Sequence, residues 1–291
     1  MLRPDDCTLD ASVEKSIREM AQRILDLAAA HGRFPTPISD IMSAAKIKVA
    51  SELWSPELIK RLKQKGGAEL CSALSKLLGV YDAQANFVYI TPDIHPQKEA
   101  FLKLHETAHA FLPWQSQTYS VIEDCEKTLD PAIATQFERE ANVFASEVLF
   151  QCDRFDIEAL DYDFSVQTPI ILSKKYGASM YSSIRRYVST NNRTCAVIVM
   201  NPFDNIRNEI TVRRIIVSKN FGRYNAPLWP SRITPFSGPG HNIFRGGNIA
   251  EKEIISIPDR DGTIHRYSTE FFSNTYQNFL FLKPTSVTTP E

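Results

Sequence analysis

The segment AFLKLHETAHAFL, residues 100–112, places two histidines and a glutamate inside an otherwise apolar run. In a helix, His105 and His109 lie one turn apart on a face shared with apolar residues, so both rings point toward the core. Burying two imidazoles without partners is costly, because each ring has a donor and an acceptor to satisfy. The segment therefore predicts either a metal site that takes one nitrogen from each ring or a pair of hydrogen-bonded core histidines.

The spacing His-Glu-x-x-His is typical of zinc peptidases, in which the glutamate, here Glu106, activates a water molecule. Because so short a pattern also arises by chance, it needs a third protein ligand as support. The later segment FEREANVFASEVL, residues 137–149, offers Glu138 and Glu140. Glu138 shares a helical stripe with small alanines that permit close approach, which favours it as the ligand and leaves Glu140 solvated. Asn142, one turn further along, is placed to hydrogen-bond a ligand histidine.

The two motifs, HETAH at 105–109 and Glu-x-x-Ala-Asn-x-Phe-Ala at 138–145, resemble those of the ImmA/IrrE-type metallopeptidases. The segment GVYD…NFVYIT before the first motif is also similar to a hairpin of that family. The resemblance covers roughly residues 35–150. One departure is VLFQ at 148–151, where the family usually has Leu-Leu-x-Pro, and this difference puts the end of the second helix in doubt.

The resemblance implies that His105, His109 and Glu138 hold Zn²⁺ and leave a fourth position for water, with Glu106 as general acid and base. It also implies a regulatory endopeptidase that cleaves a partner helix-turn-helix repressor. Cleavage would derepress stress, phage-defence or mobile-element genes. We interpret residues 86–91 as an edge strand on which the substrate adds as a further strand, with an ordinary core strand as the alternative.

A rival hypothesis is a non-catalytic, zinc-stabilised DNA-binding regulator. A closed structural zinc site needs a fourth protein ligand, and Cys125, 16 residues after His109, is the candidate. Its thiolate would occupy the water position and inhibit an enzyme until displaced; the alternative is a free surface cysteine among acidic residues. The five cysteines are odd in number and scattered, which disfavours a disulfide framework and predicts a cytoplasmic protein.

Hydrophobic periodicity predicts a helical first half and a strand-rich end of the chain. The predicted helices are 13–31, 38–46, 56–78, 131–150 and a pair within 165–189, in addition to the motif helix. The predicted strands are IKVAS, the hairpin GVYDAQANFVYIT, TCAVIVMNP, EITVRRIIVS, TIHRYST and QNFLFLK. Residues 225–247, with four prolines and four glycines, predict a long loop.

We therefore expect an α+β protein in three parts. Residues 1–152 would form a helical, zincin-like zinc metallopeptidase domain with a small β-hairpin or sheet. Residues 153–190 would form a helical connector of helix-turn-helix type, and residues 191–291 an α+β sensor or regulatory domain. We expect neither a transmembrane helix nor a secretory signal, because the chain lacks a run of eighteen apolar residues and its first residues lack an apolar core.

Charge is unevenly distributed along the chain. Residues 1–150 carry 16 basic and 21 acidic side chains, whereas residues 174–232 carry 11 basic and 2 acidic ones, with aromatic residues interleaved. Cations and ring faces together are typical of proteins that bind single-stranded nucleic acid, so we expect single-stranded DNA as a possible activator. The candidate residues are Lys174, Lys175, Arg185, Arg186, Arg193, Arg207, Arg213, Arg214, Lys219, Arg223, Tyr224 and Trp229.

Three alternatives remain for this basic segment. It could dock on the acidic N-terminal part, bind a small anionic ligand or a protein, or bind nothing. The helix pair in 165–189 offers a duplex-DNA interpretation as well, because the second helix begins with ASMYSSIRR. A structural helical pair is the simpler explanation, since the polar start of that helix is only weakly typical of DNA recognition.

Overall fold

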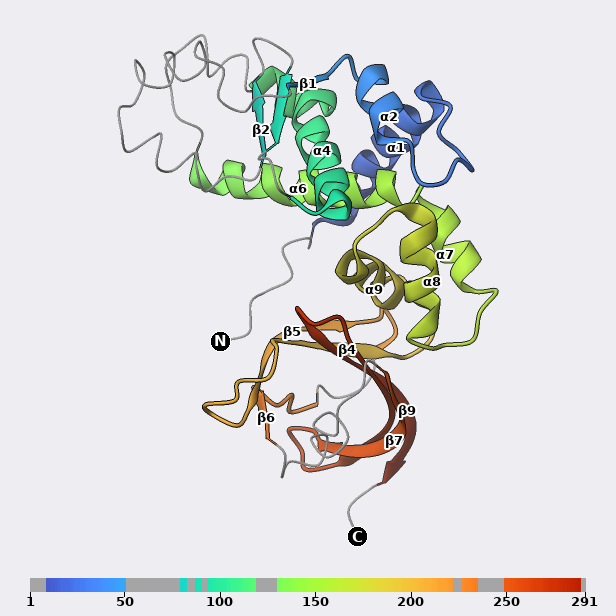
Figure 1. Ribbon diagram of the computed structural model, residues 1–291, viewed down its shortest axis with the longest axis vertical. Coiled ribbons are helices and arrows are strands. Elements are labelled where there is room, and N and C mark those ends of the chain that lie inside the picture. Colours follow the sequence, from blue (N-terminus) through green and yellow to red (C-terminus); the bar gives the residue numbers. More distant parts are fainter. Residues whose placement is uncertain are drawn as a thin grey trace. The chain divides into compact units, whose positions relative to one another are not determined.

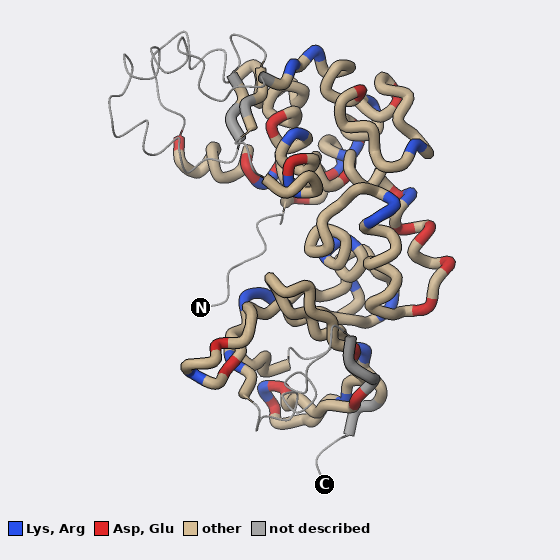
Figure 2. Tube along the Cα trace, in the orientation of Figure 1, with Lys and Arg blue, Asp and Glu red and all other residues tan. Residues whose placement is uncertain are grey.

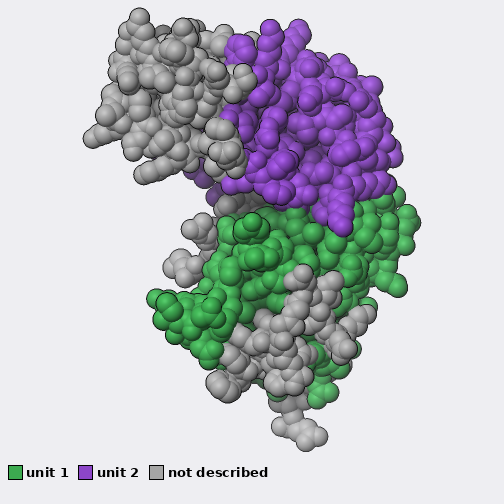
Figure 3. Space-filling model, viewed as in Figure 1, with its two compact units in different colours: residues 1–5, 156–172, 180–291 green, residues 6–155, 173–179 purple. Residues whose placement is uncertain are grey.

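The computed structural model describes residues 9–50, 79–82, 87–90, 94–118, 130–221, 227–234 and 249–288. The chain divides into two compact units (Figures 1 and 3). The helical unit comprises residues 6–155 and 173–179, and the sheet unit comprises residues 1–5, 156–172 and 180–291. These units differ from the predicted segments 1–152, 153–190 and 191–291, because the expected connector is divided between them.

Four helices dominate the described part of the helical unit: α1 (Ala11–Leu27), α2 (Ile38–Ala44), α4 (Pro96–Phe111) and α6 (Pro131–Leu149). Each begins where the sequence offers a helix start. Asp130 caps α6 by accepting a hydrogen bond from the Ala132 N–H, with Pro131 in the first position, so the helix begins at the predicted residue. The His95 ring caps α4 by accepting from the Gln97 N–H. The predicted helix 56–78 lies outside the described residues.

The end of α6 is fixed by Gln151, which stands where the resembling family usually has proline. Gln151 and Cys152 adopt φ values of 53° and 54°, the left-handed conformation that ends a helix. The Gln151 side chain accepts from the Gly32 N–H at 2.7 Å and donates to the Arg33 carbonyl at 2.8 Å. The amide thus holds the helix end against the α1–α2 loop, and α6 stops one residue before the predicted end.

A three-stranded sheet packs beside α4 and has the order β1-β3-β2. Strand β1 (Lys48–Ala50) runs parallel to β3 (Phe87–Ile90), and β2 (Gly79–Asp82) runs antiparallel to β3. The predicted hairpin is confirmed. The prediction of an edge strand at 86–91 is wrong for its described part, 87–90, because β1 and β2 pair with the two sides of β3; within the described residues the edges of the sheet are β1 and β2.

Three shorter helices follow: α7 (Asp153–Ala159), which the sequence analysis missed, α8 (Gln167–Tyr176) and α9 (Met180–Ser189). The last turn of α8 belongs to the helical unit. There the Tyr176 ring lies 4.8 Å from Phe34, 5.3 Å from Phe155 and 6.1 Å from Phe150, measured between centroids. Tyr176 is fully buried, so this aromatic cluster is part of the core of that unit.

The sheet unit contains a curled antiparallel sheet (Figure 1) with the strand order β6-β5-β4-β9-β8-β7. The strands are β4 (Ala196–Met200), β5 (Ile210–Val217), β6 (Arg232–Ile233), β7 (Ile249–Pro258), β8 (Ile264–Ser273) and β9 (Asn278–Thr288). Alternate side chains form its core, among them Ile257, Tyr267, Phe271 and Leu282. Four strands were predicted and β6 and β7 were not. Helix α9 contacts β5.

The expected mixture of helices and strands is confirmed, with the strands concentrated in the curled sheet. Among the described residues, no helix combines the length and apolar character needed to cross a membrane.

Candidate metal centre

His105 and His109 project from α4 toward Glu138 on α6. The His105 Nε2 atom lies 3.1 Å from Glu138 Oε2, and His109 Nε2 lies 3.6 Å from Glu138 Oε1. Candidate ligand atoms of the three residues all lie within 4.8 Å of one another. Both histidines are buried, whereas the Glu138 side chain is 57% exposed. The group therefore opens to solvent on the α6 side.

The donor set fits a zinc ion. Zinc bound tetrahedrally at about 2.0–2.2 Å has ligand atoms roughly 3.4 Å apart, close to the two nitrogen–oxygen distances found here. Two imidazole nitrogens and one carboxylate oxygen also match the ligand types of catalytic zinc sites, which keep one position for water or substrate. These three residues could therefore hold the metal with small side-chain adjustments.

Asn142 supports His105 from the same helix that provides Glu138. Its Oδ1 atom lies 3.1 Å from His105 Nδ1, while Glu138 contacts the other nitrogen of that ring. One turn of α6 thus holds both sides of the imidazole. When Nδ1 donates to Asn142, Nε2 keeps its lone pair for a metal.

Gln115 supports His109. Its Oε1 atom lies 2.8 Å from His109 Nδ1, and its amide donates to Glu140 Oε2 at 2.7 Å. Trp114 Nε1 donates to the same carboxylate oxygen at 2.7 Å, and Gln136 Nε2 donates to Glu140 Oε1 at 2.9 Å. Because the amide nitrogen of Gln115 is held by Glu140, its carbonyl is directed at His109, which favours the tautomer with a free Nε2.

The prediction that Glu140 is solvated is wrong: the residue is only 2% exposed. The helical turn 113–118, which follows α4, lies over this part of α6 and buries the carboxylate under Trp114 and Gln115. Three side-chain donors replace the lost water contacts. Sequence analysis missed both Trp114 and Gln115, since a single Trp-Gln pair after a helix end has no periodic pattern.

Glu106 lies next to His105 on α4 and is 8% exposed. Burial, together with the negative charge of Glu138, raises the pKa of Glu106 to about 7, although the His105 charge and a hydrogen bond from the Tyr81 backbone oppose the rise. The bond to Tyr81 places Glu106 beside strand β2. A carboxyl group with a pKa near neutrality can both accept and release a proton.

The two histidines differ in charge preference. Burial lowers the pKa of His105, but the hydrogen bond to Glu138 and the charges of Glu106 and Glu138 outweigh it and raise that pKa above its ordinary value. Burial and the neighbouring His105 charge lower the pKa of His109. The hydrogen bond from His105 lowers the pKa of Glu138. In the metal-free protein, the positive charge of the cluster is therefore favoured on His105, where Glu138 is closest.

The predicted nucleic-acid-binding residues belong to both compact units; Figure 2 colours the Lys and Arg positions of the chain blue. Lys174 and Lys175 belong to the helical unit, and the other described candidates belong to the sheet unit. Arg213 and Lys219 are exposed, while Arg207 lies 3.9 Å from Asp204. Arg223, Tyr224 and the possible zinc ligand Cys125 lie outside the described residues.

Other candidates serve the interior of the sheet unit. Arg186 is 5% exposed and donates two hydrogen bonds to Asp156, at 3.0 and 2.6 Å, so its proposed contact with nucleic acid is corrected to a structural ion pair. Trp229 is partly buried and packs against Phe221 and Tyr267 of the core. Arg214 donates to the Tyr181 hydroxyl. The buried Nη1 atom of Arg193 has no hydrogen-bond partner among the described residues.

Residues 72–186 match the family model of the M78 peptidases, described as the IrrE N-terminal-like domain. A search of curated protein sequences finds no match. Among solved structures, a transcriptional regulator from Mycobacterium tuberculosis aligns with a TM-score of 0.53 at 12% sequence identity, covering 91% of this chain and 86% of that chain. At this identity the similarity concerns the fold alone.

Proposed function

The chain carries an IrrE N-terminal-like domain of the M78 peptidase family at residues 72–186, and on that premise we propose that it is a zinc-dependent regulatory endopeptidase. The observation that carries the proposal is the convergence of His105, His109 and Glu138 within 4.8 Å, next to a buried Glu106. The zincin-like arrangement, the choice of zinc and the roles of these residues are parts of the proposal.

In this mechanism His105, His109 and Glu138 would hold the ion. A bound zinc ion supplies Lewis acidity, which makes water a stronger acid and polarises a peptide carbonyl. The buried Glu106 carboxylate accepts the proton of the attacking water and returns it to the leaving amine. A divalent cation nearby favours the ionised form of Glu106 that the first step needs.

The substrate is proposed to bind along the outer edge of β2. Among the residues that the structure describes, this strand is an edge of the small sheet, and the Tyr81 backbone hydrogen-bonds the Glu106 carboxylate. An extended peptide beside β2 would therefore pass close to Glu106, and its main chain would pair with the edge. The proposed substrate is a partner helix-turn-helix repressor whose cleavage derepresses stress, phage-defence or mobile-element genes.

Activation by single-stranded DNA through the sheet unit is the least supported part of the proposal. Its support is that Arg213 on β5 and Lys219 just after this strand are both exposed. The duplex-DNA alternative has less support, since α9 contacts β5 and buries Ser183 and Arg186.

Glu106→Gln tests the catalytic role. The substitution keeps the shape of the side chain but removes the base, so we expect the variant to bind one zinc ion per chain and to lose at least about 10²–10⁴-fold in cleavage rate. The assay mixes wild type or variant, loaded with zinc, with a helix-turn-helix repressor, chosen first among any encoded beside this gene, and follows one defined cut by mass spectrometry.

The exposed substitution Arg139→Gln on α6 is the matched control and should cleave normally. Equal cleavage by wild type and Glu106→Gln would remove Glu106 from its role. A wild type that binds zinc and the repressor without cutting it would favour the non-catalytic, zinc-stabilised regulator instead.

A further inference from the structure

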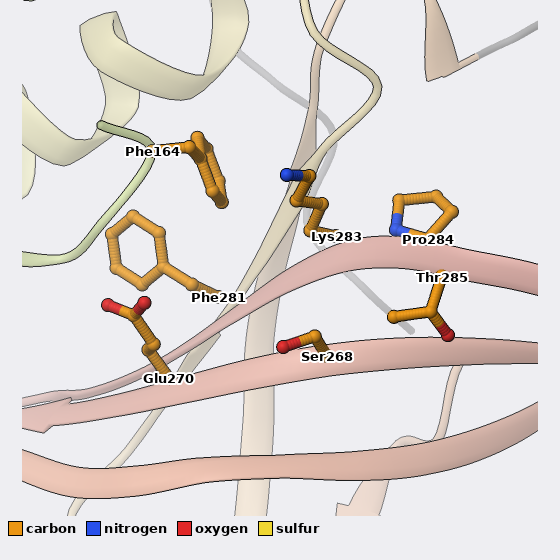
Figure 4. Close-up of a pocket in the computed structure, with 7 residues that line it drawn as sticks. All are labelled: Phe164, Ser268, Glu270, Phe281, Lys283, Pro284 and Thr285. Atoms are coloured by element: carbon orange, nitrogen blue, oxygen red, sulfur yellow. The ribbon is translucent and has the colours of Figure 1, made fainter. Parts of the chain in front are cut away.

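A hollow of about 330 Å³ lies on one face of the sheet unit. The histidine cluster belongs to the other unit, so the two sites share no residues. It is at the small end of the range of about 300–1,000 Å³ that is common for ligand sites. Figure 4 shows side chains from β8, β9 and the segment before α8 turned toward the same space. The lining residues are Phe164, Ser268, Glu270, Phe281, Lys283, Pro284 and Thr285.

The floor of the hollow follows from strand register. Ser268 on β8 lies directly opposite Lys283 on β9, and Glu270 lies opposite Phe281. Cross-strand partners project to the same face of a sheet, and residues two apart on one strand do so as well. The four side chains therefore form a fixed square in which one half is cationic and polar and the other half is aromatic and acidic.

The opposite wall is held in place by two sets of contacts. The Phe164 ring stacks on Tyr187, with centroids 5.6 Å apart and planes inclined by 14°. Glu270 Oε2 accepts from the Ser165 hydroxyl at 2.8 Å and from the Val166 N–H at 2.9 Å. The segment that carries Phe164 is thus tied to the sheet, and the hollow exists before any ligand binds, which lowers the entropic cost of binding.

The polar groups at the other end favour an anion. Among the described residues, none forms an ion pair with Lys283 and none hydrogen-bonds the Ser268 hydroxyl. In Figure 4 the Lys283 ammonium extends toward Phe164, over the hollow. An ammonium and a hydroxyl on paired strands can both donate to one carboxylate, and such charge-assisted bonds are the stronger kind.

We propose that this hollow binds a small aromatic monocarboxylate. The carboxylate would accept from Lys283 and Ser268, and the ligand ring would pack against the edge of the Phe164–Phe281 pair, two rings that contact each other with centroids 6.2 Å apart and planes tilted by 60°. The negative charge of Glu270 beside the rings disfavours ligands that carry two negative charges, such as phosphate esters. The proposal goes beyond the peptidase function and does not depend on it.

Phenylacetate serves as the probe, and binding is measured by titration calorimetry and saturation-transfer NMR with the full chain. Benzylamine carries the ring with the opposite charge, and acetate carries the charge without the ring. We expect phenylacetate to bind at least tenfold more tightly than either. Lys283→Met should weaken phenylacetate binding by about 10–100-fold, because a charge-assisted hydrogen bond is lost, and Lys283→Arg should restore most of it.

Phe164→Leu should weaken phenylacetate binding several-fold while leaving acetate unaffected. The exposed Lys219→Met is the matched control and should bind like wild type. No detectable phenylacetate binding, or equal binding of acetate and phenylacetate that ignores Phe164→Leu, would overturn the proposal. Glu106→Gln should bind phenylacetate normally, so a failure here and a failure of the peptidase proposal remain distinguishable.

Discussion

Between α4 and α6 the polar side chains bond to one another across the helix pair, whereas the candidate cations of the sheet unit are distributed over α9, β5 and loops. Glu138 and Asn142 contact opposite sides of the His105 ring. By contrast, Arg213 and Lys219 face solvent, and Arg186 forms an ion pair with Asp156.

This difference has an energetic cause. A buried polar group without a partner is costly, so polar groups that persist between packed helices must converge on each other or on a bound ion. Exposed cations keep their hydration and need no partner, so many of them in one stretch of sequence do not have to share a surface. Spacing on a helix is therefore stronger evidence for a site than composition of a segment.

The largest expected effect is on metal affinity. Glu138→Ala removes one of the three proposed ligands, and each ligand of a zinc site accounts for several of the ~10–16 kcal/mol by which structural sites hold the ion. We expect zinc affinity to fall at least about a thousandfold, measured by competition with a chromogenic chelator. Retention of wild-type affinity would mean that another residue holds the metal.

Arg186→Met tests whether the buried cation is structural. Removing it leaves Asp156 without its ion-pair partner, so we expect the sheet unit to lose about 3 kcal/mol, the lower end of the range because Asp156 keeps some solvent access. Arg213→Met, at an exposed position on β5, should change stability by no more than about 0.5 kcal/mol. The measurement is urea unfolding followed by circular dichroism; equal effects of the two substitutions would contradict the contrast between buried and exposed cations.

Glu140→Gln tests whether Glu140, which holds Gln115 against His109, affects the zinc affinity of the site. The amide cannot accept as strongly from Trp114 and Gln115, so Gln115 is less firmly directed at His109. We expect zinc affinity to fall by about 10–100-fold, with histidine tautomers in the metal-free protein shifting in ¹⁵N NMR spectra. Arg139→Gln is the control on the same helix. An unchanged tautomer and an unchanged affinity together would make Glu140 a purely structural residue.

The smallest effect is expected for the exposed cations. If Arg213 and Lys219 each neutralise one phosphate, Arg213→Glu with Lys219→Glu should reduce the salt dependence of single-stranded DNA binding by roughly one log unit per log of salt for each contact. Zinc content should not change. Fluorescence anisotropy with short oligonucleotides across a salt series measures this, and a wild type that binds none at low salt would end the DNA hypothesis.

Local periodicity accounts for what could be predicted from the sequence. Helical spacing alone puts His105 and His109 on one face, and alanine neighbours single out Glu138. The burial of Glu140 could not be predicted in this way, because it is caused by Trp114 and Gln115 from a different segment. Helices α4 and α6 and the strands β4, β5, β8 and β9 follow from periodicity in the same manner.

Position within a sheet also escaped prediction. Strand β3 has the composition of any half-buried strand, and nothing in its own residues shows that β1, almost forty residues earlier, pairs with its far side. Edge and centre are decided by pairing between distant segments. The short helix α7 was missed because it follows directly on a reversal of the chain at Gln151 and Cys152. Both residues adopt left-handed conformations there, which neither residue type predicts.

Recombination between genes joins segments at single breakpoints, and the place of Tyr176 limits where a breakpoint can fall in this chain. A junction within residues 156–172 would keep Phe155 but replace Tyr176, leaving Phe34 and Phe150 beside a void. Losing a large buried aromatic side chain costs about 3–5 kcal/mol, a large part of the stability of a typical domain. A lineage that exchanges its sheet unit for another module therefore has to inherit residues 173–179 with the helical unit, and new modules can be grafted only beyond α8.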